Sequence, residues 1–240
     1  MRFSTSDVAN FIGTHVVPFT NPRVVCPPGR IRPQDRRNII VATPMRSGTH
    51  ILIDLILNNL RDYRNNPLYV DLDQCRKQRG PGNDLLADIT PKAGHLVKTH
   101  MPLNVPNDMP GDPHVKQLIG EGIVVTVRRS RADVCRSLGH WHRLDMAEAE
   151  QRYGAEYDRF WQVWDDHDGI ALRFEDLFDP AAMQQFLQRL GNETGTSPAS
   201  RYIAPPSGKN RNRIYANKVL TRLLGRRAKR IDTTIHTLKA

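Results

Sequence analysis

The clearest pattern along the chain is an apolar run, a short polar turn and a second apolar run, all between residues 38 and 54. The first run, at 39–41, is continuous and mostly β-branched, which is typical of a strand buried on both faces of a parallel sheet. The second run, at 51–60, is apolar at helical spacing and nearly all round, which predicts a central helix packed on that sheet. The turn between them therefore connects a strand to a helix.

The same kind of pattern predicts alternating strands and helices along the rest of the chain. Short apolar runs predict three further strands, at residues 95–100, 123–127 and 169–174. Helical spacing predicts three further helices, at residues 132–144, 146–167 and 180–190. Residues 64–94 and 103–121 are rich in Gly, Pro or polar residues and are predicted to be loops. We therefore expect an α/β domain built on a parallel sheet.

The two ends of the chain depart from this pattern. Residues 1–37 combine many prolines and arginines with little periodicity, which predicts an extended arm on the domain surface. We expect one domain over residues 38–240, because a chain of 240 residues is long enough for one α/β domain with a sizeable core. From Ser207 onward the chain is basic. For residues 222–230 we favour a solvated helix face over contact with nucleic acid or an acidic membrane.

Composition narrows the partners and the compartment. A formal charge of +10 and a pI near 9.9 imply an anionic partner, which could be a polyphosphorylated small molecule, nucleic acid or an acidic membrane surface. The three cysteines include no C-x-x-C pair, which argues against a disulfide framework or a zinc site. No apolar run reaches the ~18 residues of a membrane span, and the N-terminus lacks a signal-peptide h-region. A cytoplasmic location is therefore expected.

The turn at Arg46-Ser-Gly-Thr49 is suited to holding an anion. A helix N-terminus offers unpaired N–H groups and the positive end of the helix dipole. This turn adds a guanidinium, two hydroxyls and a glycine that lets an anion come close to the main chain. The alternative is an ordinary turn in which Ser47 or Thr49 caps the helix. A Walker A motif is excluded, because its first glycine is absent and His50 follows Thr49.

Two further predicted strand ends carry basic groups. Residues 98–100 (Lys-Thr-His) end one strand, and Arg129 and Arg131 follow another. In an open parallel sheet, ligands bind at the carboxyl ends of the strands. We therefore expect these side chains and Arg46 to form a pocket for a ligand with several anionic groups. His100 would add a group that can take a proton near neutral pH, although a lone loop histidine is more often solvated.

Four motifs, in the same order, resemble those of the sulfotransferases that use 3′-phosphoadenosine 5′-phosphosulfate (PAPS). Residues 43–50 are similar to the family's T-Y-P-K-S-G-T-T-W motif, and Lys98-Thr-His100 to its K-[ST]-H segment. Residues 129–137 match its 3′-phosphate motif, R-x-x-x-D-V-x-x-S, and Phe174-Glu-Asp-Leu177 is similar to its Y-E-D-L segment. The resemblance spans residues 38–180. It implies a three-layer α/β/α domain with a mostly parallel central sheet, the P-loop NTPase-like sulfotransferase fold.

The resemblance also implies roles for the matching residues. In the first motif, the residues that bind the cosubstrate would be Arg46, Ser47, Gly48, Thr49 and His50. The first four of these would hold the 5′-phosphosulfate. Arg129 and Ser137 would bind the 3′-phosphate, and no metal is implied. His100 would be the general base on the acceptor hydroxyl, and Lys98 would stabilise charge around the transferring sulfuryl group, with Arg46 also catalytic. Sulfuryl transfer, like phosphoryl transfer, needs in-line positioning and charge neutralisation.

This chain departs from the family's pattern at several positions. Arg46 replaces a lysine, which keeps the charge and adds a bidentate fork. The family's adenine-stacking tryptophan falls at Ile51, and Phe174 lacks the hydroxyl of the Y-E-D-L tyrosine. The family's C-terminal segment that closes over the 3′-phosphate has a weak counterpart here, in which Lys209 and Arg211 are the candidate contacts.

The main hypothesis is therefore transfer of a sulfuryl group from PAPS to a hydroxyl or amine of a small-molecule, glycan or lipid acceptor. A small P-loop phosphotransferase is an alternative, but the chain lacks the Walker lysine and the Mg²⁺-holding hydroxyl that follows it. A non-catalytic binder of nucleic acid or of an acidic membrane, through the basic tail, is another. For the aromatic residues at 153–164 we favour core packing over the wall of an acceptor pocket, so the pattern does not specify the acceptor.

Overall fold

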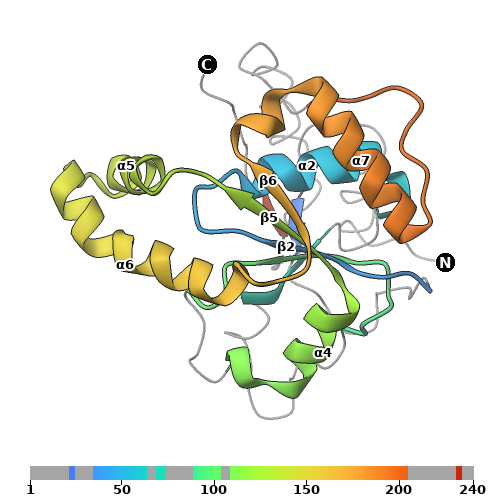
Figure 1. Ribbon diagram of the computed structural model, residues 1–240, viewed down its shortest axis with the longest axis horizontal. Helices are drawn as coiled ribbons and strands as arrows, with labels where there is room; N and C mark the ends of the chain where they lie inside the picture. Colours follow the sequence, from blue (N-terminus) through green and yellow to red (C-terminus); the bar gives the residue numbers. More distant parts are fainter. Residues whose placement is uncertain are drawn as a thin grey trace.

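A five-stranded parallel sheet lies at the centre of the molecule (Figure 1). In this computed structural model the described residues are 22–24, 35–63, 69–73, 89–103, 109–204 and 231–233. The spatial order of the strands is β3 (Val70–Asp71), β4 (Leu96–Thr99), β2 (Ile39–Ala42), β5 (Ile123–Arg128) and β6 (Ile170–Arg173). Every neighbouring pair is parallel, so crossovers must join the strands. The predicted α/β class with a mostly parallel sheet is confirmed.

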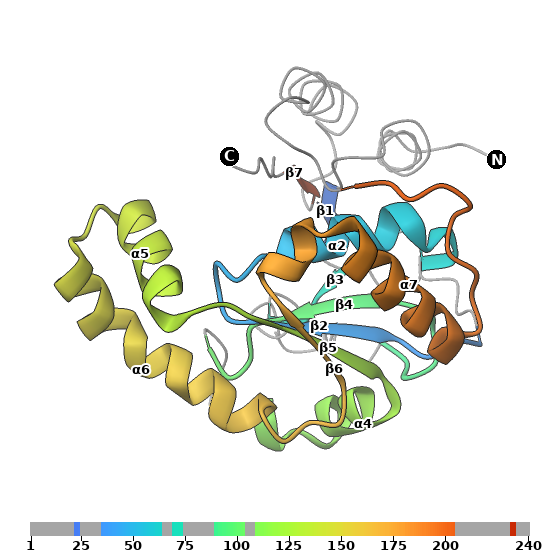
Figure 2. The same ribbon diagram turned by 45° about the horizontal axis from the view of Figure 1, so that its top comes forward.

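Helices cover both faces of this sheet (Figure 2). One face carries α2 (Thr49–Asn59) and α7 (Pro180–Thr194), and the other carries α4 (Pro113–Glu121) and α6 (Met146–Trp164). Along the central strand, Ile39 and Val41 pack with α2 and α7, whereas Ile40 and Ala42 pack with α4 and α6. Because both faces bury apolar side chains, β2 is a continuous apolar run. The predicted three-layer arrangement is confirmed.

The pair formed by α5 (Arg131–His142) and α6 extends beyond the sheet (Figure 1). A small separate core joins the two helices, made by Val134, Cys135, Leu138, Ala149 and Tyr153. The C-terminal half of α6 packs on the sheet instead, where Phe160, Trp161 and Trp164 are at most 8% exposed. The interpretation of these aromatic residues as core packing is confirmed.

The prediction of a loop over residues 103–121 was wrong, because this segment contains α4. Asp112 caps the helix by accepting hydrogen bonds from the N–H groups of His114 and Val115, and Pro113 occupies its first turn. The helix α7 begins with the same pair of residue types, Asp179 and Pro180. Here the neighbouring glycines and prolines hid the helical spacing of the residues that α4 buries, Val115, Leu118 and Ile119.

The prediction of a loop over residues 64–94 was also wrong in part, because it contains the edge strand β3. This strand pairs with β4 through Val70 opposite Val97 and Asp71 opposite Lys98. The side chains of Asp71 and Asp73 are almost fully buried. Acidic residues at alternate positions break the apolar run by which a buried strand is normally recognised, and a strand of two residues adds little pattern of its own.

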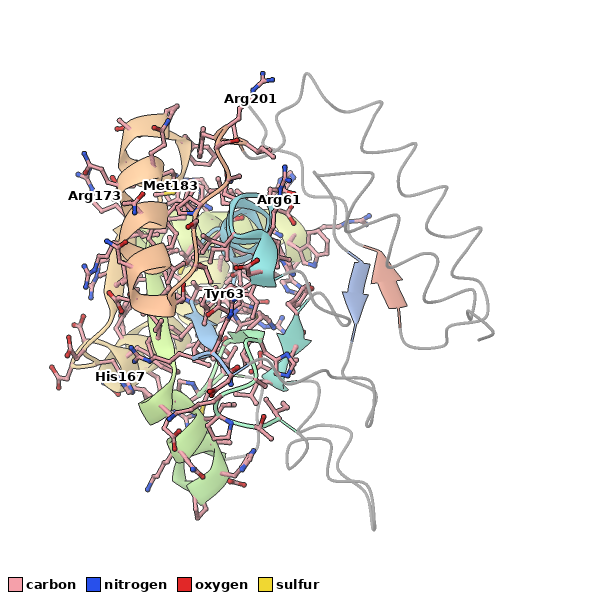
Figure 3. The ribbon with its side chains drawn as sticks, turned by 90° about the vertical axis from the view of Figure 1, so that its right-hand side faces the viewer. Arg61, Tyr63, His167, Arg173, Met183 and Arg201 are labelled. Carbon is pink, nitrogen blue, oxygen red and sulfur yellow. The ribbon has the colours of Figure 1, made fainter. Side chains whose placement is uncertain are left out.

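Residues 36 and 37, which we assigned to the N-terminal arm, are tied to the domain. Arg37 donates to the Gly122 carbonyl oxygen at 2.7 Å and accepts, through its own carbonyl, the hydroxyl of Tyr63 at 2.6 Å. Figure 3 shows Tyr63 and Met183 within the packed interior, whereas His167 and Arg173 point outward.

Little of the predicted arm and basic tail falls within the described residues. The backbone of β1 (Pro22–Val24) pairs antiparallel with β7 (Ile231–Thr233). The remaining predictions for residues 1–34 and 205–240 lie outside the described part of the chain. Among the described helices, none combines the length and the apolar character needed to cross a bilayer.

Candidate functional site

Three adjacent strands bring predicted site residues together at their carboxyl ends. Thr43 follows β2, His100 follows β4 and Arg129 follows β5. His100 Nδ1 lies 2.7 Å from the Thr43 carbonyl oxygen, and Arg129 Nη1 donates to the Arg46 carbonyl oxygen at 2.8 Å. The first contact spans 57 positions of the sequence and the second spans 83. Both reach the same segment, the β2–α2 loop at 43–48.

The N-terminus of α2 has no side-chain cap. The residue before the helix is Gly48, in the left-handed conformation with φ of 90°. Thr49 Oγ1 lies 2.6 Å from Thr43 Oγ1, and the Ser47 hydroxyl is buried with no hydrogen-bond partner among the described residues. The alternative of a turn capped by Ser47 or Thr49 is therefore wrong. The start of α2 and the Ser47 hydroxyl are left to interact with a ligand oxygen.

The replacement Gly48→Ala is expected to lower the free energy of unfolding by about 1–3 kcal/mol, because an L side chain is strained at this φ. A Cβ at this position would also lie 2.7 Å from Leu177 Cδ1 and 3.1 Å from the Phe174 ring. Urea denaturation measures the change. The control is Gly120→Ala in α4, where a Cβ meets no atom within 4 Å and stability should rise by up to about 1 kcal/mol. Equal effects of the two replacements would contradict the strained turn.

Arg46 and Arg129 place two like charges at the β2–α2 loop. Arg46 Nε donates to Ser137 Oγ at 3.1 Å. Neither guanidinium forms an ion pair with a described acidic residue, and Arg129 Nε is buried without a described hydrogen-bond partner. Burial, and then the charge of Arg129, lower the pKa of Arg46; burial lowers the pKa of Arg129, although Asp133 and Glu175 act in the opposite direction. Two adjacent cations with an unsatisfied donor favour a bound anion.

Aromatic side chains hold Arg129 from two sides. Its guanidinium carbon lies 4.2 Å from the ring centre of Phe174, which precedes η4 (Glu175–Phe178). Tyr157 of α6 donates its hydroxyl to the Arg129 carbonyl oxygen at 2.7 Å. Phe174 also borders Gly48 of the β2–α2 loop. Phe174, which the family resemblance places near the adenine, therefore supports the arginine of the 3′-phosphate motif.

Arg46 has two structural features that its sequence neighbourhood did not reveal. Its φ is 66°, and holding a residue other than glycine in this region costs on the order of 1 kcal/mol. Its guanidinium carbon lies 5.1 Å from the ring centre of Trp141 on α5. Trp141 stands at helical spacing from Val134 and Leu138, yet those two side chains are buried and that of Trp141 is 68% exposed. Because α5 extends beyond the sheet, no layer of the described elements covers Trp141, and its ring lies beside Arg46 instead.

The contact between His100 and Thr43 defines which ring nitrogen can act as a base. A carbonyl oxygen only accepts hydrogen bonds, so His100 Nδ1 carries a hydrogen where it meets the Thr43 carbonyl oxygen. In the neutral ring, Nε2 is then the basic nitrogen. The bond also orients the ring relative to the β2–α2 loop. A neutral imidazole held in this way can accept a proton at Nε2.

Lys98 is engaged with two buried carboxyl groups. Its ammonium lies 3.0 Å from Asp73 Oδ2 and 3.3 Å from Asp71 Oδ1, and all three side chains are at most 5% exposed. Burial raises the pKa of Asp73, but Lys98, His100 and hydrogen bonds outweigh it, so the pKa is lowered overall. The lysine that we predicted to stabilise the sulfuryl group is thus paired with two buried carboxyl groups.

Other predicted site residues lie apart from the arginine pair or outside the described chain. The His50 ring meets that of Tyr69 edge-on, with centroids 6.2 Å apart. Arg131 turns toward α6, where it lies 3.4 Å from Asp158 and 3.5 Å from Glu150. The positions of Lys209 and Arg211 are outside the described residues.

Sequence reasoning missed Asp73, Tyr157 and Trp141 as neighbours of the site. For Asp73 a signal exists: the stretch Tyr69-Val-Asp-Leu-Asp73 alternates apolar and acidic residues, and a buried carboxylate requires a cation such as Lys98. For Tyr157 and Trp141 no local signal exists, because their contacts depend on how α5 and α6 leave the sheet.

The chain matches no protein-family model and no curated protein. Among solved structures, the chain is similar to retinol dehydratase in a complex with retinol and PAP (TM-score 0.41, 16% identity), over 82% of this chain and 81% of that one. It is also similar to retinol dehydratase in complex with androsterone and inactive cofactor PAP (TM-score 0.41, 19% identity), over 78% of this chain and 72% of that one.

Proposed function

We propose that the protein is a sulfotransferase that moves a sulfuryl group from PAPS to a hydroxyl or amine of an acceptor. The observation that carries this proposal is the junction of Arg46, Arg129 and Ser137 at the uncapped start of α2. Beside it stands His100, whose basic nitrogen is defined by its bond to Thr43. These residues include the key positions of three of the motifs that resemble the family.

The donor groups fit a ligand with two anionic ends. The start of α2, the Ser47 hydroxyl and the Arg46 guanidinium would hold the 5′-phosphosulfate. Arg129, with its buried and unsatisfied Nε, would hold the 3′-phosphate together with Ser137. The hydrogen bond from Arg46 to Ser137 supports a site in which these two halves would adjoin. When bound, PAPS would supply the activated sulfuryl group.

The chain's own residues would then act on the acceptor and on the developing charge. His100 Nε2 would take the proton of the acceptor hydroxyl while that oxygen bonds to sulfur, and the bond from sulfur to the phosphate oxygen would break. Arg46 would neutralise the charge that develops on the leaving phosphate. No protein nucleophile is needed, since positioning and charge neutralisation supply the catalysis.

Thermal unfolding with adenosine 3′,5′-bisphosphate (PAP), with ATP and Mg²⁺, and with duplex DNA tests this proposal. At 100 times its Kd, PAP should add about 2.7 kcal/mol of stability, a rise in Tm of roughly 5–10 °C for a domain of this size. ATP and DNA should produce a much smaller rise. No shift with millimolar PAP would sink the proposal, and a shift with ATP and Mg²⁺ alone would favour a phosphotransferase. With PAP binding established, incubation with labelled PAPS and candidate acceptors, read by mass spectrometry, identifies the acceptor.

A further inference from the structure

A buried carboxylate, Asp73, binds three consecutive residues at the end of β4. Asp73 Oδ2 accepts from Lys98 Nζ at 3.0 Å and from the His100 backbone N–H at 2.9 Å. Asp73 Oδ1 accepts from the Thr99 hydroxyl at 2.7 Å. Since Asp73 is 2% exposed, these donors take the place of water around its charge. One side chain next to the edge strand β3 therefore holds the chain where it passes from β4 to His100.

The residues on the other side of His100 are held as well. The Thr99 hydroxyl, while donating to Asp73, accepts from the Met101 N–H at 2.9 Å. The Met101 carbonyl oxygen accepts from Trp164 Nε1 of α6 at 2.6 Å. His100 thus lies between two backbone positions that the protein interior fixes. Its ring then meets the Thr43 carbonyl oxygen, the contact that makes Nε2 the basic nitrogen.

Charge explains why a carboxylate holds this position better than a neutral side chain would. Asp73 stays ionised, since Lys98 and His100 outweigh the effect of its burial, and hydrogen bonds to an ionised acceptor are roughly twice as strong as neutral ones. Lys98 balances the charge of Asp73 and is shared with Asp71 at 3.3 Å. The ammonium is therefore engaged with the carboxyl groups of Asp71 and Asp73.

We propose that Asp73 is the positioning residue of the general base: it holds Thr99 and His100 so that His100 Nδ1 bonds to Thr43 and Nε2 faces the acceptor. This inference rests on the proposed function for its kinetic consequence. Its structural content, the orientation and tautomer of His100, can be measured without any transfer reaction.

The kinetic test compares Asp73→Asn in the parental protein and in a His100→Ala background. An asparagine at 73 places an amide NH₂ group where Asp73 accepts hydrogen bonds from residues 98–100. We therefore expect kcat to fall roughly 30- to 100-fold. KM for PAPS and Kd for PAP should change less than about 3-fold. In the His100→Ala background the same replacement should change the residual rate less than about 2-fold, because it acts through His100. Equal losses in both backgrounds would overturn the proposal. Asp62→Asn, which removes an exposed carboxylate paired with Arg36, is the control and should leave kcat unchanged.

A second variant addresses the risk that Asp73→Asn fails to fold. Thr99→Val keeps the shape of the side chain and both charges but removes the hydroxyl between Asp73 and Met101, and should lower kcat by roughly 3- to 10-fold with PAP binding unchanged. A parental kcat in Thr99→Val would contradict the proposal that the contact between Asp73 and Thr99 positions His100.

Nitrogen NMR of labelled histidine, with His100 assigned by the His100→Ala spectrum, supplies a readout independent of transfer. The parental ring should show a protonated Nδ1 and an unprotonated Nε2 at pH 8, and Thr99→Val or Asp73→Asn should shift this signal toward a tautomer mixture. Unchanged His100 signals in both variants would overturn the proposal. If the parental protein transferred no sulfuryl group while the variants still shifted the signal, the proposed function would fail and the role of Asp73 in orienting His100 would stand.

Discussion

Replacing Arg129 by methionine is expected to raise the Kd for PAP by roughly 30- to 100-fold, the loss that follows when charge-assisted hydrogen bonds to a phosphate are removed. The side chain is replaced at similar length, so Phe174 keeps an apolar neighbour, and the hydrogen bond from Tyr157 to the backbone carbonyl of residue 129 is retained. Isothermal titration with PAP measures the change. Because Arg129 lies at the 3′-phosphate end of the proposed site, adenosine 5′-monophosphate, which lacks that phosphate, should bind the variant and the parental protein about equally.

The control for this prediction is Arg131→Met, two residues further along the chain. Arg131 carries the same charge but forms its contacts with Glu150 and Asp158 of α6. The Arg131 variant should bind PAP like the parental protein, because the contacts of Arg131 are with α6. It is a matched control, since net charge changes equally in both variants. Similar weakening by the two replacements would show that overall charge, and not a defined phosphate contact, attracts the nucleotide.

His100→Ala is expected to lower the transfer rate by about 10²- to 10⁴-fold, the usual contribution of a general base. PAP binding should stay within about 3-fold of the parental value, since the ring bonds to the Thr43 carbonyl and the arginine contacts do not include it. Transfer is measured under saturating PAPS with an acceptor found by the mass-spectrometric screen, and binding by titration with PAP.

The matched control is His167→Ala, because His167 is an exposed histidine after α6 whose ring packs on that of Trp164, with centroids 4.9 Å apart. Its replacement should leave both transfer and PAP binding unchanged. Parental transfer by the His100 variant would remove His100 from the mechanism, and loss of PAP binding in that variant would instead give it a structural role.

The elements that sequence predicted correctly are those whose burial produces a simple pattern. β2 packs against helices on both faces, so Ile39, Ile40 and Val41 are all apolar. The start of α7 was visible because Asp179 caps the helix through the Ala181 N–H and Pro180 follows. Local chemistry of this kind is written in adjacent residues.

The misses share a different cause, which is that tertiary contacts supply what the local pattern lacks. Buried Asp71 and Asp73 read as polar loop residues because their compensating cation, Lys98, lies on the neighbouring strand. Trp141 reads as a core residue, since nothing in its helical spacing shows that α5 extends beyond the sheet (Figure 1).

The proximity of the candidate site residues was easier to predict than their contacts. Motif order singled out Arg46, His100, Arg129 and Ser137 as candidates, and parallel topology places three of the four at adjacent strand ends. The hydrogen bond from Arg46 to Ser137 was not predictable, because it depends on the left-handed backbone at Arg46. The tautomer of His100 was equally hidden, since its partner is a backbone carbonyl that any residue at position 43 would provide.

The place of β3 at the edge of the sheet gives the two halves of the site unequal resistance to local opening. β3 pairs with β4 over only two residues, whereas β2, which leads into the arginine-bearing loop, is flanked by strands on both sides. Edge segments with few hydrogen bonds open at lower free energy than the centre of a sheet. As temperature rises, Asp73 would therefore release His100 before the arginine-bearing loop is lost, and under the proposed function the protein would pass through a state that still binds PAP but has no aligned base.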